Sequence, residues 1–161
     1  MSYGTHFYLI QPRSRADRQF IDQFIPLIRR VYGNDSVWFD DDIHGGVDWW
    51  QMILNEIEKC DIFVYLISNE SLESPYCRAE LREALRLKKQ ILPVIVRRLI
   101  PVYPGNIEDD LAVVLRRTQY VDMSGGFRDA NTIASLYAAL TRLLNTIPQH
   151  PLNPVTLTPT P

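Results

Sequence analysis

One run of the sequence, Ile62–Ile67, constrains the fold more than any other, because its six residues are all apolar or aromatic. Such a run is typical of a strand that is buried on both faces of a parallel sheet. Further runs that are mostly apolar or aromatic occur at His6–Ile10, Ser36–Phe39, Ile91–Val96 and Gln119–Val121. The sequence therefore predicts five strands that form a sheet, and both faces of this sheet must be covered by other elements.

Segments with helical periodicity separate these strands. In the first, Phe20, Phe24 and Ile28 recur at steps of four, and Gly33 follows as a stop signal. Further helical segments are expected near 48–60, 74–89, 109–117 and 131–145. The alternation predicts an α/β fold with a five-stranded parallel sheet and helices on both faces. Right-handed crossovers favour the flavodoxin-like strand order 2-1-3-4-5.

Local signals refine three of these elements. Ser74 followed by Pro75 predicts an N-cap with proline in the first helical turn. Asp48, with Gln51 three residues later, predicts an arrangement like a capping box. Pro93 lacks a backbone donor, so it indicates an edge-facing side or the beginning of its strand.

Ligands in this fold class bind beyond the carboxyl ends of the strands, near the point where the strand order reverses. Three loops are expected to meet there, at 11–16, 40–48 and 68–74. This expectation comes from topology alone.

Composition narrows the functional class. The chain has 161 residues and a formal charge of −2, which is consistent with one domain and argues against nucleic-acid binding. No apolar run approaches the ~20 residues that span a bilayer, and the N-terminus does not resemble a signal peptide. We expect a cytoplasmic protein without membrane association, with reduced and buried thiols at Cys60 and Cys77.

Several motifs of cofactor and metal chemistry are absent from the sequence. It has neither a G-x-G-x-x-G nor a G-x-x-x-x-G-K-[ST] phosphate loop, and its cysteines and histidines lack zinc-like spacing. Asp40–Asp42 follow the second predicted strand, and we interpret them as a solvated acidic loop rather than a magnesium site. The sequence predicts no metal and no cofactor.

The segment Ser74–Leu81 carries the most specific pattern. Tyr76 and Glu80 are four residues apart, so they share one face of the predicted helix. No basic residue lies three or four positions from Glu80. Glu80 could therefore face a cleft, or it could be an ordinary solvent-exposed helical glutamate.

From Thr5 to about Ile147 the chain resembles a TIR (Toll/interleukin-1 receptor) domain, particularly the bacterial type. Trp38–Trp49 resembles strand B with the BB loop, and Cys60–Ser68 resembles strand C. Ser74-x-x-Cys77-x-x-Glu80-Leu81 is similar to the S-x-x-C-x-x-E-L start of helix C, and Leu92–Val96 to strand D.

Many TIR domains cleave NAD+, and the resemblance implies that Glu80 is the catalytic residue. It implies substrate-binding roles for the aromatic residues Tyr76 and Trp49, although Trp49 could equally be a core residue. Gln11 and Arg13 occupy the region in which the family contacts nicotinamide and phosphate. The chain departs from the family there, because the usual Ser-Tyr pair is missing.

The implied activity is that of an NAD+ glycohydrolase, which releases nicotinamide and linear or cyclic ADP-ribose in prokaryotic antiphage signalling. NAD+ is then the substrate, and no cofactor is required. The family self-associates through the BB loop, here Asp42–Val47. Two alternatives remain open: a non-catalytic TIR scaffold that acts through TIR–TIR contacts, and a nucleoside deoxyribosyltransferase of the same topology.

The last 14 residues differ in composition from the rest. They hold five of the 11 prolines and no charged side chain, which is typical of an extended linker. We expect a TIR domain over residues 1–147 and a disordered Pro/Thr-rich tail over 148–161. The tail would lead to a sensor or oligomerisation module beyond residue 161.

Overall fold

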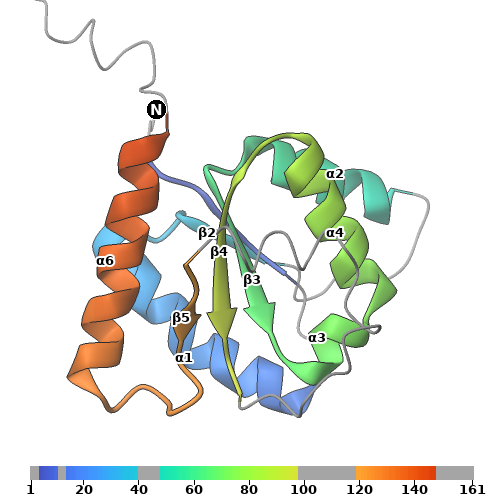
Figure 1. Ribbon diagram of the computed structural model, residues 1–161. Coiled ribbons are helices and arrows are strands. Elements are labelled where there is room, and N and C mark those ends of the chain that lie inside the picture. Colours follow the sequence, from blue (N-terminus) through green and yellow to red (C-terminus); the bar gives the residue numbers. More distant parts are fainter. Residues whose placement is uncertain (1–3, 11–13, 40–47, 98–118, 148–161) are drawn as a thin grey trace, which may run out of the picture.

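The computed structural model describes residues 4–10, 14–39, 48–97 and 119–147. Their strands form one parallel sheet in the order β2-β1-β3-β4-β5 (Figure 1). The strands are β1 (Phe7–Leu9), β2 (Val37–Phe39), β3 (Ile62–Ile67), β4 (Gln90–Ile95) and β5 (Val121–Asp122). The predicted fold class and strand order are confirmed.

Helices cover both faces of the sheet. They are α1 (Arg15–Tyr32), α2 (Trp49–Lys59), α3 (Asn69–Glu73), α4 (Pro75–Arg86) and α6 (Ala130–Thr146). The α1 and α6 helices lie on one face, and α2 and α4 lie on the other (Figure 1). The Tyr137 hydroxyl donates to the Leu27 carbonyl at 2.8 Å, which ties α6 to α1. The helix expected near 109–117 and the tail at 148–161 lie outside the described residues.

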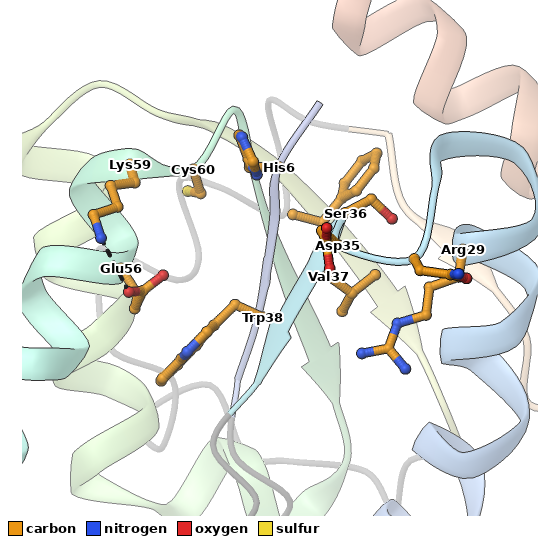
Figure 2. A pocket seen from close by; sticks show the side chains of 11 residues that line it. His6, Arg29, Asp35, Ser36, Val37, Trp38, Glu56, Lys59 and Cys60 are labelled. Atoms are coloured by element: carbon orange, nitrogen blue, oxygen red, sulfur yellow. Dashed lines mark hydrogen bonds and ion pairs between the residues drawn. The ribbon is translucent and has the colours of Figure 1, made fainter. Parts of the chain in front are cut away.

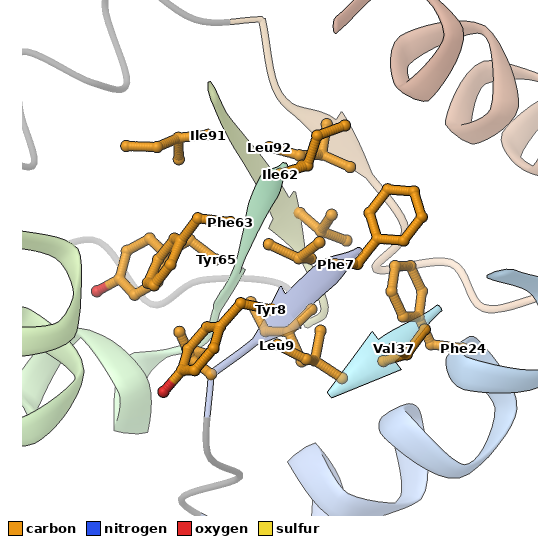
Figure 3. Packing of buried hydrophobic residues seen from close by; sticks show 14 of the residues in the cluster. Phe7, Tyr8, Leu9, Phe24, Val37, Ile62, Phe63, Tyr65, Ile91 and Leu92 are labelled. Carbon is orange, nitrogen blue, oxygen red and sulfur yellow. The ribbon is translucent and has the colours of Figure 1, made fainter. Parts of the chain in front are cut away.

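The core consists of two layers, one on each face of the sheet. Every residue of β1 and β3 is buried. Because side chains alternate along a strand, Phe7 points toward α1 while Tyr8 and Phe63 point toward α4 (Figure 3). This alternation places tyrosine hydroxyls under the helices on the α2 and α4 side.

The cap signals are only partly confirmed. The Ser74 hydroxyl accepts from the Cys77 amide at 3.2 Å, as predicted for the start of α4. Asp48 occupies the N-cap position of α2, but its side chain makes no capping hydrogen bond. Gln51 instead donates to Asn55 one turn further along, at 3.0 Å. The predicted capping box at Asp48 is therefore wrong.

Pro93 lies inside β4, and hydrogen bonding explains why it is tolerated there. The Ile95 carbonyl accepts from Met123 beside β5 at 2.8 Å, so Ile95 and Pro93 both direct their backbone groups toward that strand. β5 pairs only with Val94 and Ile95. The backbone nitrogen of Pro93, which carries no hydrogen, therefore faces β5 at a position where the pairing between β4 and β5 has not yet begun.

The turn after α4 supplies a cap for another helix, and this gives a first prediction. The Lys89 ammonium donates to the carbonyls of Glu58 at 2.5 Å and Cys60 at 2.9 Å, where α2 ends. A cation that satisfies terminal carbonyls also complements the helix dipole. We expect Lys89→Met to lower the free energy of unfolding by about 1–2 kcal/mol in urea titrations. Lys88→Met, in the same exposed turn, is the control, and an equal loss in both variants would contradict the capping role.

Candidate functional site

Glu80 lies on α4 and is fully buried, with 0% of its surface exposed. Its carboxylate oxygen Oε2 accepts a hydrogen bond from the hydroxyl of Tyr8, a residue of β1 that is 72 positions away in the sequence. The interpretation of Glu80 as a solvent-exposed helical residue is therefore wrong. Its partner is a tyrosine of the central sheet, and the sequence pattern around Glu80 gives no sign of this.

Tyr8 is held by rings on both sides. It is paired with Trp38 of β2 and Phe63 of β3 in the sheet register, so the three side chains lie on the same face. The Tyr8 ring stacks on each neighbour with ring centroids 5.2 Å apart. Stacking on both sides leaves the ring little freedom to rotate, so the position of the hydroxyl is set by the sheet.

An aromatic pair lies one turn before Glu80. Tyr76 of α4 meets Trp49, the first residue of α2, edge to face with ring centroids 5.1 Å apart. Tyr76 is 50% exposed, and Trp49 is partly buried. The structure thus brings three predicted site residues, Glu80, Tyr76 and Trp49, to the neighbouring starts of α2 and α4. Gln11, Arg13 and the loop at 42–47 lie outside the described residues.

A second polar cluster, which the sequence analysis missed, lies at the carboxyl ends of β3 and β4. Asp17, in the first turn of α1, is only 2% exposed. Its Oδ1 accepts from the Arg97 guanidinium at 2.6 Å, and its Oδ2 accepts from the Ser68 hydroxyl at 3.1 Å. Arg97 also pairs with Glu70. This Asp17–Arg97 cluster joins three segments of the edge at which ligands of this fold class bind.

The cluster continues into the short helix that leads to α4. Ser68 and Ser71 form the capping box that begins α3. The Arg78 guanidinium of α4 donates to the Leu72 carbonyl of α3 at 2.9 Å. A backbone hydrogen bond and the Arg97 guanidinium together hold the pKa of Glu70 below its usual value. These contacts fix the position of the segment that connects β3 to α4.

A cavity of about 630 Å³ lies at the opposite edge of the sheet (Figure 2). Its lining includes His6, Ser36 and Cys60, the residues just before β1, β2 and β3. It therefore lies at the amino ends of the strands. Tyr76, at the start of α4, instead follows the carboxyl end of β3. The position of this cavity does not match the edge that the topology predicts for a ligand.

Cys60 of this cavity gives a prediction on pH dependence. Burial raises the pKa of its thiol from about 9 to about 12. Between these values the unfolded thiol loses its proton while the folded one keeps it, so stability falls as the pH rises. We expect the free energy of unfolding to drop by about 1 kcal/mol more in the wild type than in Cys60→Ala between pH 8 and pH 10. Parallel urea titrations measure this difference, and equal drops would contradict it.

No group of three or more His, Cys, Asp or Glu side chains within the described residues could hold a metal ion. No helix among the described segments is long and apolar enough to cross a membrane. Cys60 and Cys77 are both buried and unbridged, as predicted.

Comparisons with known proteins bear on the family. A family model described as "TIR domain" matches residues 13–138. The fold is similar to the TIR domain of the Toll-related receptor TRR-2 from Hydra magnipapillata, with a TM-score of 0.57 and 17% identity over 86% of this chain and 98% of that one. No curated protein matches the chain significantly.

Two enzymes share the architecture. The CMP N-glycosidase BcmB from Clostridium botulinum aligns with a TM-score of 0.52 and 13% identity, over 81% of this chain and 98% of its own. The 2-desoxiribosyltransferase from Leishmania mexicana aligns with a TM-score of 0.51 and 14% identity, over 88% of this chain and 98% of its own. At these identities the likeness concerns the fold.

Proposed function

The chain belongs to the TIR domain family, and from this premise we propose that it hydrolyses the bond between nicotinamide and ribose in NAD+. The observation that carries the proposal is the place of Glu80. This glutamate of the S-x-x-C-x-x-E-L segment is buried, is held by the hydroxyl of Tyr8, and lies one turn from the aromatic pair of Trp49 and Tyr76.

One carboxylate is sufficient for this reaction. Ordinary glycosidases need a second carboxyl group, because the leaving oxygen must be protonated or water must be activated. Nicotinamide in NAD+ is a cationic pyridinium, so it departs as a neutral base with the bonding electrons and needs no proton. Positive charge then develops on the ribose, and the Glu80 carboxylate stabilises it. Water adds to the sugar carbon, giving ADP-ribose and one proton.

The other predicted site residues would bind the substrate. Trp49 and Tyr76 present ring surfaces on which a base or the nicotinamide ring can stack. Gln11 and Arg13 follow β1 in the sequence, and in the proposed function Arg13 would pair with the pyrophosphate. The reaction requires no cofactor, because the leaving group carries its own positive charge.

Two enzymes of similar fold, which are named as an N-glycosidase and a desoxiribosyltransferase, offer an analogy for the chemistry. The analogy supports the view that this architecture can accommodate sugar-transfer chemistry, and it assigns no substrate to this chain. The product could be linear ADP-ribose, or cyclic ADP-ribose if an atom of the adenine replaces water as the nucleophile.

We further propose that activity depends on self-association. In this scheme the loop at 42–47, whose sequence includes Gly45 and Gly46, completes the site of a neighbouring copy. The segment 148–161 would join the domain to a sensor or oligomerisation module. The biological setting would be cytoplasmic antiphage signalling.

A non-catalytic scaffold is the second candidate function. The observation that favours it is the sequence after β1, where Gln11 and Pro12 replace the family's Ser-Tyr pair. Such a module would keep the fold and the TIR–TIR contacts but would not bind NAD+. The deoxyribosyltransferase alternative would require a nucleoside substrate instead.

An assay of nicotinamide release separates these functions. The purified chain is incubated with NAD+ at several protein concentrations, with and without a crowding agent, and nicotinamide is quantified by liquid chromatography. Release that rises more steeply than protein concentration is expected for an enzyme completed by assembly. A folded and assembled protein that releases none would favour the scaffold, and turnover of deoxynucleosides would favour the transferase.

A further inference from the structure

We propose that Tyr8 is a positioning residue for the reaction, because its hydroxyl holds the carboxylate of Glu80 in the orientation that meets the ribose. The inference rests on the proposed function and extends it to a residue that the sequence pattern does not indicate. It starts from a contact between a strand and a helix: the Tyr8 hydroxyl of β1 donates to Oε2 of Glu80 on α4.

The two partners differ in their freedom to move. A glutamate side chain has three rotatable bonds and loses rotamer freedom when its carboxylate is fixed. The Tyr8 ring lies between the rings of Trp38 and Phe63 and is 1% exposed. The donor is therefore fixed before a substrate arrives, and it selects one orientation of the carboxylate.

Orientation matters for this chemistry. A displacement of about 1 Å in a reacting group can cost roughly a hundredfold in rate. The hydroxyl of Tyr8 thus holds the carboxylate of Glu80 in the orientation that the proposed mechanism needs.

The variant that isolates this role is Tyr8→Phe, which removes one oxygen and keeps the ring between its two neighbours. We expect kcat for nicotinamide release to fall about 10- to 100-fold, with KM for NAD+ changed less than about threefold. Tyr137→Phe is the matched control, because it removes the hydroxyl that bonds Leu27 between α6 and α1. This control should lose comparable stability and keep its kcat.

A second background shows whether Tyr8 acts through Glu80. Glu80→Asp shortens the side chain and withdraws the carboxylate from the Tyr8 hydroxyl. In that background, adding Tyr8→Phe should lower the residual kcat less than about threefold, because residues that act as one unit are not additive. Equal fold losses in both backgrounds would show that Tyr8 does not act through this carboxylate and would overturn the inference.

The outcomes separate the two proposals. An unchanged kcat in Tyr8→Phe, with an active wild type, overturns the positioning role and leaves the proposed function intact. A kcat that falls only in proportion to the folded fraction, measured by circular dichroism, also overturns it, since the role is then structural. A wild type that releases no nicotinamide under any condition overturns the proposed function and this inference with it.

Discussion

Replacing Glu80 by Gln is expected to reduce nicotinamide release by about a thousandfold or more while the chain stays folded. Glutamine has nearly the same shape, and its amide oxygen can still accept the hydrogen bond from the Tyr8 hydroxyl. What is lost is the negative charge that, in the proposed mechanism, offsets the developing charge on the ribose. The buried position of Glu80 strengthens this effect, because electrostatic interactions are larger where water is excluded.

The measurement compares turnover and stability in the same preparations. Nicotinamide release is followed by liquid chromatography, and thermal unfolding by circular dichroism. Glu83→Gln is the matched control, since Glu83 lies on the same helix and pairs with the exposed Arg86 at 2.6 Å. That variant should keep wild-type turnover, because exposed ion pairs of this kind contribute at most about 1 kcal/mol. Wild-type turnover in Glu80→Gln would remove Glu80 from the mechanism.

Replacing Arg97 by Met should destabilise the chain by about 3 kcal/mol. Asp17 is 2% exposed and receives the Arg97 guanidinium at 2.6 Å. Removing only the guanidinium takes a charge partner away from this buried carboxylate and leaves its hydrogen bond to Ser68 in place. The partial exposure of Arg97 places the expected loss at the lower end of the range for buried pairs.

A double substitution isolates the contribution of the ion pair between Asp17 and Arg97 to stability. Asp17→Asn combined with Arg97→Met removes both charges, and it should recover most of the stability lost in the single variant. Glu70→Gln breaks only the more exposed of the two pairs that Arg97 makes, so it should lose less than about 1 kcal/mol. Urea titrations compare the variants. A loss in Arg97→Met no larger than that in Glu70→Gln would show that Asp17 does not depend on the guanidinium.

The elements with strong local patterns could be predicted from the sequence. The apolar run Ile62–Ile67 is the fully buried β3, and the alternation of elements led to the correct strand order. Ser74 caps α4 as expected, because a hydroxyl before a proline is a local signal. The five-residue helix α3 escaped prediction, since it is too short to show a helical period.

The partners of the candidate site residues could not be predicted. No basic residue lies three or four positions from Glu80, yet this spacing favours neither an exposed nor a buried place. Tyr8 and Glu80 are 72 positions apart, and Asp17 and Arg97 are 80 apart. A period of two or 3.6 residues assigns a side chain to a face, but the packing of helix on sheet decides which atoms meet across it.

The candidate catalytic carboxylate and its donor both belong to regular elements, and this has a consequence for how the domain can diversify. Tyr8 stands on a central strand and Glu80 on a helix packed over it, so the loops contribute nothing to the hydrogen bond between them. Loops tolerate insertions and substitutions far better than the packed elements they connect. The segments after β1 and β2 can therefore change in length and chemistry without disturbing the carboxylate, and under the proposed function such changes would alter which substrate is admitted. In such a scaffold new specificity is open to selection while the reactive group stays in place.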